Sequence, residues 1–210
     1  MKRVMTSGLL TGVMATVALL ATGPMAWSAA TSTWPCVQRK VAEISLAAIW
    51  PGPELDAVAT TWRDDAAVAE LVQRLAVRRT SLADATAAIA EFARASGNGR
   101  ARQLQMVMAG LLETINAERA EVMAGLERFG DGQKQMAELL RMENAKVSEL
   151  RTAANPNPAD VDARAEQLLW NLRIFNERQK SLSAVCEVPV LIEQRLFALA
   201  KEIHKALQER

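Results

Sequence analysis

Apolar residues recur at alternating steps of three and four along the second half of the chain, and this spacing limits the fold more than any other feature. The first seam consists of Leu104, Met108, Leu111, Ile115, Val122, Gly125 and Phe129. One polar residue interrupts each of three successive seams: Glu118, Glu143 and Gln179. Such spacing is typical of helices that pack along their length as in a coiled coil.

Strand signals are scarce in the rest of the chain. It has no tyrosine and no run of alternating β-branched residues, whereas Ala, Leu, Glu, Gln and Arg, which favour helices, are abundant. Asp64 or Asp65 can cap one early helix, and Ser81 with Asp84 resembles a capping box that opens the next. We therefore predict an all-α fold.

Glycine and proline set the predicted helix ends. We expect helices over about 64–79, 81–95, 100–129, 133–153, 159–184 and 189 to the end, after an irregular arm that holds a short helix near 41–50. Short links imply antiparallel neighbours, so the four later helices would form an up-down bundle with the early helices beside it. The alternative is an extended antiparallel coiled coil in which residues 100–153 project.

The first thirty residues have the layout of a secretory signal peptide. Lys2 and Arg3 precede a charge-free apolar stretch, and small residues before Thr31 favour cleavage after Ala30, with cleavage after Ser28 as the second choice. An uncleaved membrane anchor is the alternative, because the stretch approaches the length that spans a bilayer. We predict a periplasmic protein with a signal peptide over 1–30, an arm over 31–63 and a helical domain over 64–210.

Removal of the signal peptide leaves 23 basic and 24 acidic residues, a net charge of −1. This balance provides no basic field for nucleic acid, and no later stretch is long and apolar enough to cross a membrane. Contact with a membrane is expected only if the signal segment stays uncleaved.

The chain has two cysteines, Cys36 and Cys186. Cys36 lies too far beyond the apolar stretch for a lipoprotein, and the spacing excludes a C-x-x-C-H haem site. A free thiol or a disulfide remains, and an even cysteine count outside the cytosol favours the Cys36–Cys186 disulfide. It would tie the arm to the start of the last predicted helix.

The sequence offers little for catalysis. His204 is the only histidine, it has no carboxylate at helical spacing, and we expect it to be solvated. A single histidine cannot complete a di-iron bundle site, and no phosphate-binding, dinucleotide or nucleophile motif occurs. We predict no enzyme activity, no metal and no cofactor.

The leading hypothesis is therefore a non-catalytic scaffold or adaptor that binds an unknown protein or a second copy of itself. The second is a carrier or sensor with a small-ligand cavity between the helices. Trp50 and Trp62 are candidate partner contacts because tryptophan is frequent at binding hot spots, although core packing is the simpler interpretation. Candidate ligand contacts are the polar interruptions Glu118, Glu143 and Gln179.

Overall fold

The computed structural model describes residues 34–209, and every regular element within them is helical. The elements are α1 (Leu46–Ile49), the 3-10 turn η1 (Trp62–Asp64), α2 (Ala66–Ala76), α3 (Leu82–Ala95), the 3-10 turn η2 (Gly97–Gly99), α4 (Arg100–Thr152) and α5 (Pro158–Gln208). The predicted all-α class is confirmed. The predicted signal peptide lies outside the described residues.

The early helices begin where their capping residues predict. The Asp65 carboxylate accepts hydrogen bonds from the amides of Ala67 and Val68, which opens α2. The Ser81 hydroxyl accepts from the amide of Asp84 at 3.1 Å, which opens α3. These bonds satisfy amide groups that have no partner inside the helix.

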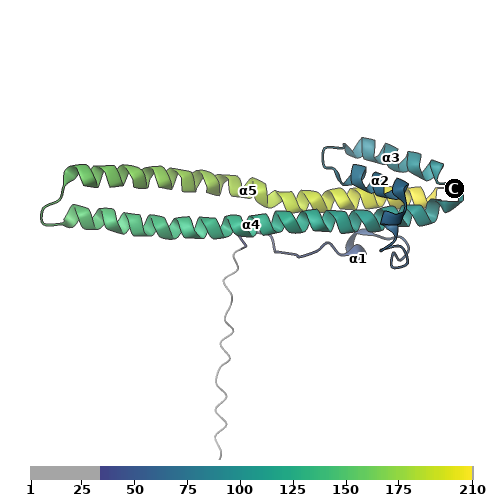
Figure 1. The fold of residues 1–210 in the computed structure, drawn as a ribbon, viewed down its shortest axis with the longest axis horizontal. Coiled ribbons are helices and arrows are strands. Elements are labelled where there is room, and N and C mark those ends of the chain that lie inside the picture. The colour runs from purple at the N-terminus through teal and green to yellow at the C-terminus, as the bar shows by residue number, and fades with distance from the viewer. Residues whose placement is uncertain (1–33, 210) are drawn as a thin grey trace, which may run out of the picture. The chain divides into compact units, whose positions relative to one another are not determined.

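Two long antiparallel helices, α4 and α5, replace the four later helices predicted from the sequence (Figure 1). The predicted break at residues 130–132 is wrong, because α4 runs through both glycines to Thr152. Glycine costs a helix only about 1 kcal/mol, and packing against α5 offsets that cost. Among the described glycines only Gly97 has a positive φ, so Gly130 and Gly132 are not used to end the helix.

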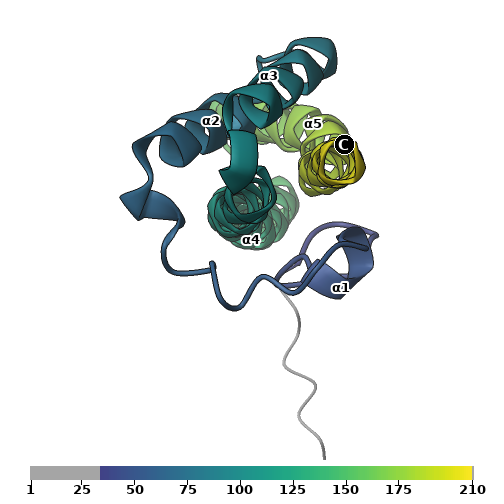
Figure 2. The same ribbon diagram turned by 90° about the vertical axis from the view of Figure 1, so that its right-hand side faces the viewer.

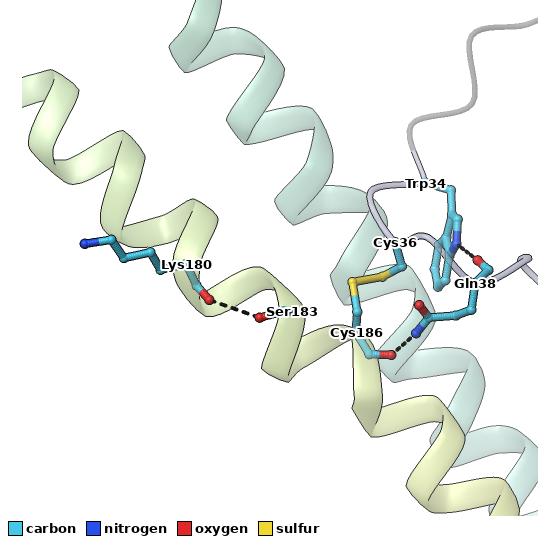
Figure 3. Close-up of a disulfide and its surroundings, with 6 residues drawn as sticks. All are labelled: Trp34, Cys36, Gln38, Lys180, Ser183 and Cys186. Carbon is cyan, nitrogen blue, oxygen red and sulfur yellow. Dashed lines mark hydrogen bonds between the residues drawn. A yellow bond between two sulfur atoms is a disulfide. The ribbon is translucent and has the colours of Figure 1, made fainter.

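The predicted start of a separate helix near Pro189 is also wrong. Pro189 is buried inside α5, where it has no amide hydrogen for the carbonyl of Val185. Proline normally bends a helix at such a position instead of ending it when tertiary contacts hold both halves. Figure 3 shows α5 changing direction near Cys186, three residues before the proline.

The base comprises α1, α2, α3, the first part of α4 and the last part of α5, which share one apolar core. Figure 2 shows α2 and α3 on one side of the α4–α5 pair and α1 on another. The largest fully buried side chains of this core include Leu75, Ile89, Leu104, Met108, Leu111, Ile115, Leu196, Leu199 and Ile203. The rest of α4 and α5 forms the hairpin, whose smaller core is centred on Leu140, Val147 and Leu168.

The register of α4 changes at the end of the base. The sequence predicts that the seam passes through Glu118, but Arg119 is buried instead, with 4 % of its surface exposed. The buried side chains step by four three times in succession, from Leu111 to Ile115, to Arg119 and to Met123. Consecutive steps of four depart from the alternation of three and four, as in a stutter, and rotate the buried face around the helix.

The arm accounts for the buried arginine. The Arg119 guanidinium donates hydrogen bonds to the carbonyls of Val41 and Ala42, at 2.5 and 3.1 Å. The Asn116 side chain accepts from the Ile44 amide at 2.9 Å and donates to the Ile44 carbonyl at 3.2 Å. Side chains of α4 thus form hydrogen bonds with backbone groups of the arm, as a neighbouring strand would in a sheet.

The predicted Cys36–Cys186 disulfide is confirmed, with a distance of 5.6 Å between the Cα atoms (Figure 3). It joins the arm to the interior of α5, not to the start of a helix as predicted, because α5 is continuous. Beside the bond, Gln38 donates to the Cys186 carbonyl and Trp34 donates to the Gln38 carbonyl at 2.7 Å. The bond therefore fastens the arm near the junction of base and hairpin.

Candidate functional site

The two tryptophans predicted as partner contacts are both buried in the base. The Trp50 indole donates to the carbonyl of Pro53 at 2.8 Å and meets the His204 ring edge-on, with the ring centroids 5.7 Å apart. The Trp62 indole donates to the Glu113 carboxylate at 2.9 Å. In this structure both rings pack the core and satisfy their N–H groups within the chain.

Trp62 is part of a clamp between η1 and α4. Both nitrogens of the Arg63 fork donate to the Glu113 carboxylate, at 3.0 and 2.7 Å, and the guanidinium lies 4.2 Å from the centroid of the Trp62 ring. The hydrogen bond from Arg63 lowers the pKa of Glu113, and the bond from Trp62 lowers it further. This bidentate pair serves packing, since it fixes the orientation of the indole.

The three polar interruptions of the predicted seams do not converge. Glu118 is half-buried at the base and forms an ion pair with Arg78 at 2.9 Å. Glu143 lies 25 residues farther along the same helix, about 38 Å away by the helical rise. Gln179 is exposed on α5. The structure therefore gathers no shared ligand site from these residues.

A half-buried arginine, Arg195, holds the end of α2. The Arg195 guanidinium donates to the carbonyls of Leu75, Val77 and Thr80, at 2.9, 3.0 and 2.9 Å. Burial lowers the pKa of Arg195, and the charge of Glu118 acts in the opposite direction. A cation at a helix C-terminus also interacts favourably with the helix dipole. Sequence reasoning missed this residue, because its role depends on a loop 115 residues away.

The prediction of a solvated His204 is wrong. The ring is half-buried: one edge meets Trp50, and the Gln208 amide lies 2.9 Å from Nε2. The Nδ1 atom is buried without a hydrogen-bond partner. The folding of the arm over the end of α5 causes the difference, since the helix sequence alone places His204 among charged residues.

Exposed apolar side chains, with charged and polar residues between them, form an open surface on one side of the hairpin, which we call the outer strip. It consists of Phe129, Leu139, Glu143 and Leu150 on α4 and of Ala163, Gln167, Trp170 and Ile174 on α5. Trp170 is 58 % exposed, and the neighbouring Leu169 is 67 % exposed. The outer strip is thus an open surface of mixed character, on which these apolar side chains alternate with charged ones such as Glu166 and Arg173.

The outer strip could have been recognised in the sequence. Residues 163, 167, 170 and 174 follow the same steps of four and three as the buried seam of α5, displaced by two positions from it. The sequence interpretation followed one seam on each helix and therefore missed Trp170. A helix with two such seams has two surfaces to bury.

A depression separate from the outer strip, which we call the arm groove, lies between the arm and α4 in the base. It has a volume of about 690 Å³, and Leu46, Leu55 and Leu112 form part of its apolar lining. Its acidic groups include Glu43 and Asp56, neither of which forms an ion pair within residues 34–209. The volume falls within the range of small-molecule sites.

Within residues 34–209, no three His, Cys, Asp or Glu side chains are grouped so that they could hold a metal ion. None of the helices in the same range combines the length and apolar character needed to cross a membrane. The chain matches no family model, no curated protein and no solved structure.

Proposed function

We propose that this protein is exported to the periplasm and binds another protein without catalysis, with the hairpin as the binding element. The observation that carries the proposal is the exposed indole of Trp170 on the outer strip. Exposed apolar area is unfavourable in water, and tryptophan is enriched among the residues that dominate binding energies. A partner that covers Trp170 would remove that unfavourable contact with water.

The attachment of the hairpin supports this role. The disulfide between Cys36 and Cys186 and the bonds from Arg119 to the arm hold the base together where the hairpin leaves it. These bonds limit the motion of the hairpin relative to the base before a partner binds, which lowers the entropy cost of association.

The disulfide also supports a place outside the cytosol, where thiols are not kept reduced. The predicted signal peptide over residues 1–30 supplies the route. Cell fractionation followed by N-terminal sequencing tests both points. We expect a periplasmic chain that begins at Thr31; a full-length chain in the membrane fraction would contradict cleavage.

Photo-crosslinking in cells tests the binding role. Benzoylphenylalanine at position 170 should yield a covalent adduct with one discrete protein, identified by mass spectrometry. The same probe at Arg94, an exposed position on α3 in the base, serves as the control. The proposal fails if position 170 gives no adduct or gives the same adducts as position 94.

The arm groove favours a second candidate function, the carriage of a small apolar ligand. The neutral probe N-phenyl-1-naphthylamine should fluoresce when it binds there. Ala117→Phe places a ring among the groove residues and should abolish the signal, whereas Ala101→Phe, at an exposed α4 position outside the groove, should not. Equal fluorescence in both variants would exclude the arm groove as the site.

A further inference from the structure

We infer that the outer strip binds a second copy of this chain, with the two hairpins antiparallel about a two-fold axis near Trp170 and their four helices forming a bundle. This inference rests on the proposed function, because it assigns a partner to the same strip. A two-fold interface uses the same surface on both copies, so that surface must be complementary to itself. The continuity of the outer strip, its area and its pattern of charges each bear on this requirement.

The outer strip is one continuous surface. Three hollows of about 560, 660 and 460 Å³ follow one another along the hairpin. The first two share Ala163 and Gln167 in their linings, and the last two share Trp170 and Arg173. The surface therefore extends without a gap from Leu150 near the tip to Phe129.

The extent of this surface suits a dimer. Leu150 and Phe129 are 21 residues apart on α4, which corresponds to about 32 Å. The middle hollow is lined by α5 alone, so the strip is between about 10 Å (one helix) and about 20 Å (two packed helices) wide and covers about 320–640 Å² in projection. Stable interfaces bury about 800 Å² of accessible surface on each partner, and accessible surface exceeds its projection.

Charge along α5 changes sign at Trp170. Asp160 and Glu166 lie toward the tip, whereas Arg173 and Arg178 lie toward the base. None of these four forms an ion pair within residues 34–209. The other charged residues that line the hollows are Glu143 and Arg164 toward the tip and Glu177 toward the base, the last paired with Lys180 at 2.9 Å and also attracted by Arg173. With them included, the lining carries a formal charge of −2 on the tip side of Trp170 and +1 on the base side.

An antiparallel second copy makes these charges complementary. Glu166 and Arg173 lie four residues before and three residues after Trp170, so each faces the other type across the axis. Asp160 and Arg178 lie ten residues before and eight residues after Trp170 and are brought together in the same way. Parallel copies would place like charges opposite one another, which is why we infer the antiparallel arrangement.

Sedimentation equilibrium of the mature chain from about 1 to about 100 µM tests the dimer directly, a range in which weak to moderate association is measurable. The wild-type chain should dimerise. Trp170→Glu should abolish the dimer, whereas Met142→Glu, at an exposed apolar residue outside the hollows, should retain it. Circular dichroism checks that both variants fold.

Reversal of single charges tests whether the two copies are antiparallel. Glu166→Arg and Arg173→Glu should each raise the dissociation constant about tenfold or more, because each reversal affects two symmetry-related contacts. The chain with both substitutions should dimerise as the wild type does, and an equimolar mixture of the two single variants should form a heterodimer.

Three results would overturn the inference: a monomeric wild type, a dimer unaffected by Trp170→Glu, or single charge variants that do not pair when mixed. A monomeric wild type together with a discrete adduct of another protein at position 170 would leave the proposed function standing and remove only the second copy. If the wild type is monomeric and position 170 gives no adduct, both the second copy and the proposed function are refuted.

Discussion

Gly110 on α4 lies against Trp62 of η1 and Val72 of α2, and a single added methyl group tests this packing. A Cβ atom at this position would lie 2.8 Å from Cδ2 of Trp62 and 2.8 Å from Cγ2 of Val72. Real Cβ atoms essentially never approach other heavy atoms within 3.0 Å, so Gly110→Ala forces the indole or the helices to move. We expect this substitution to destabilise the protein.

The magnitude follows from two opposing effects. Overpacking of a filled core costs about 1–3 kcal/mol, and we take about 3 kcal/mol because Arg63 and Glu113 hold the indole in place. Alanine favours the helix by about 1 kcal/mol relative to glycine. The free energy of unfolding should therefore fall by about 2 kcal/mol, which lowers the melting temperature by about 4–8 °C in a chain of this size.

Urea unfolding followed by far-ultraviolet circular dichroism measures this loss. Gly125→Ala is the matched control in the same helix, because its Cβ would meet only the end of the Arg128 side chain, at 3.8 Å. The control should gain about 1 kcal/mol in unfolding free energy from helix propensity alone. If Gly110→Ala is as stable as the wild type, the packing described for Trp62 is wrong.

Three further perturbations have expected outcomes. Replacing Cys36 and Cys186 by serine should lower the free energy of unfolding by up to about 5 kcal/mol in urea, because the bond closes a loop of 150 residues. Arg195→Met leaves three carbonyls without their donor and should cost about 2 kcal/mol, measured by thermal melting. The hydrogen bond from Gln103 and those from the first amides of α2 lower the pKa of Asp65 in the folded protein. The stabilisation that the ionised Asp65 provides is therefore complete above its pKa in the unfolded chain, about 4, and is lost as the pH falls through its lower pKa in the folded protein. The free energy of unfolding of the wild type should therefore exceed that of Asp65→Asn by a constant amount from about pH 7 to about pH 4 and by less at about pH 2, as measured by urea unfolding.

Local signals in the sequence predict local structure well. The caps at Asp65 and Ser81 depend on a few adjacent residues, and both helices begin where these caps place them. The Cys36–Cys186 pairing required only the even count and the compartment, since no other pairing is available within the chain. None of these predictions depends on which helices are neighbours.

Helix length could not be predicted in the same way, because it depends on a balance between local cost and distant packing. Gly130 and Pro189 each disfavour a helix locally, yet both lie buried inside long helices. The neighbouring helix supplies the contacts that offset the cost, and a sequence window around either residue does not contain that neighbour. The buried Arg119 has the same origin, because its partners are carbonyls 77 and 78 residues away.

The same limit explains why the sequence predicts the apolar seam of the second half of α4 but not how deeply each of its positions is buried. Phe129, Met136, Glu143 and Leu150 are spaced by seven, and so are Leu126, Gln133, Leu140 and Val147, three positions earlier. The structure buries the second set against α5 and leaves the first at the edge of the hairpin, half exposed. Together the two sets form one seam of alternating steps of three and four, as the sequence predicts, and Met136 packs on the hairpin core. Spacing alone cannot say which of the two sets is the more exposed, and a further pair of helices would cover the half-exposed one. Sedimentation of Trp170→Glu against Met142→Glu decides this question, because only the first changes the outer strip.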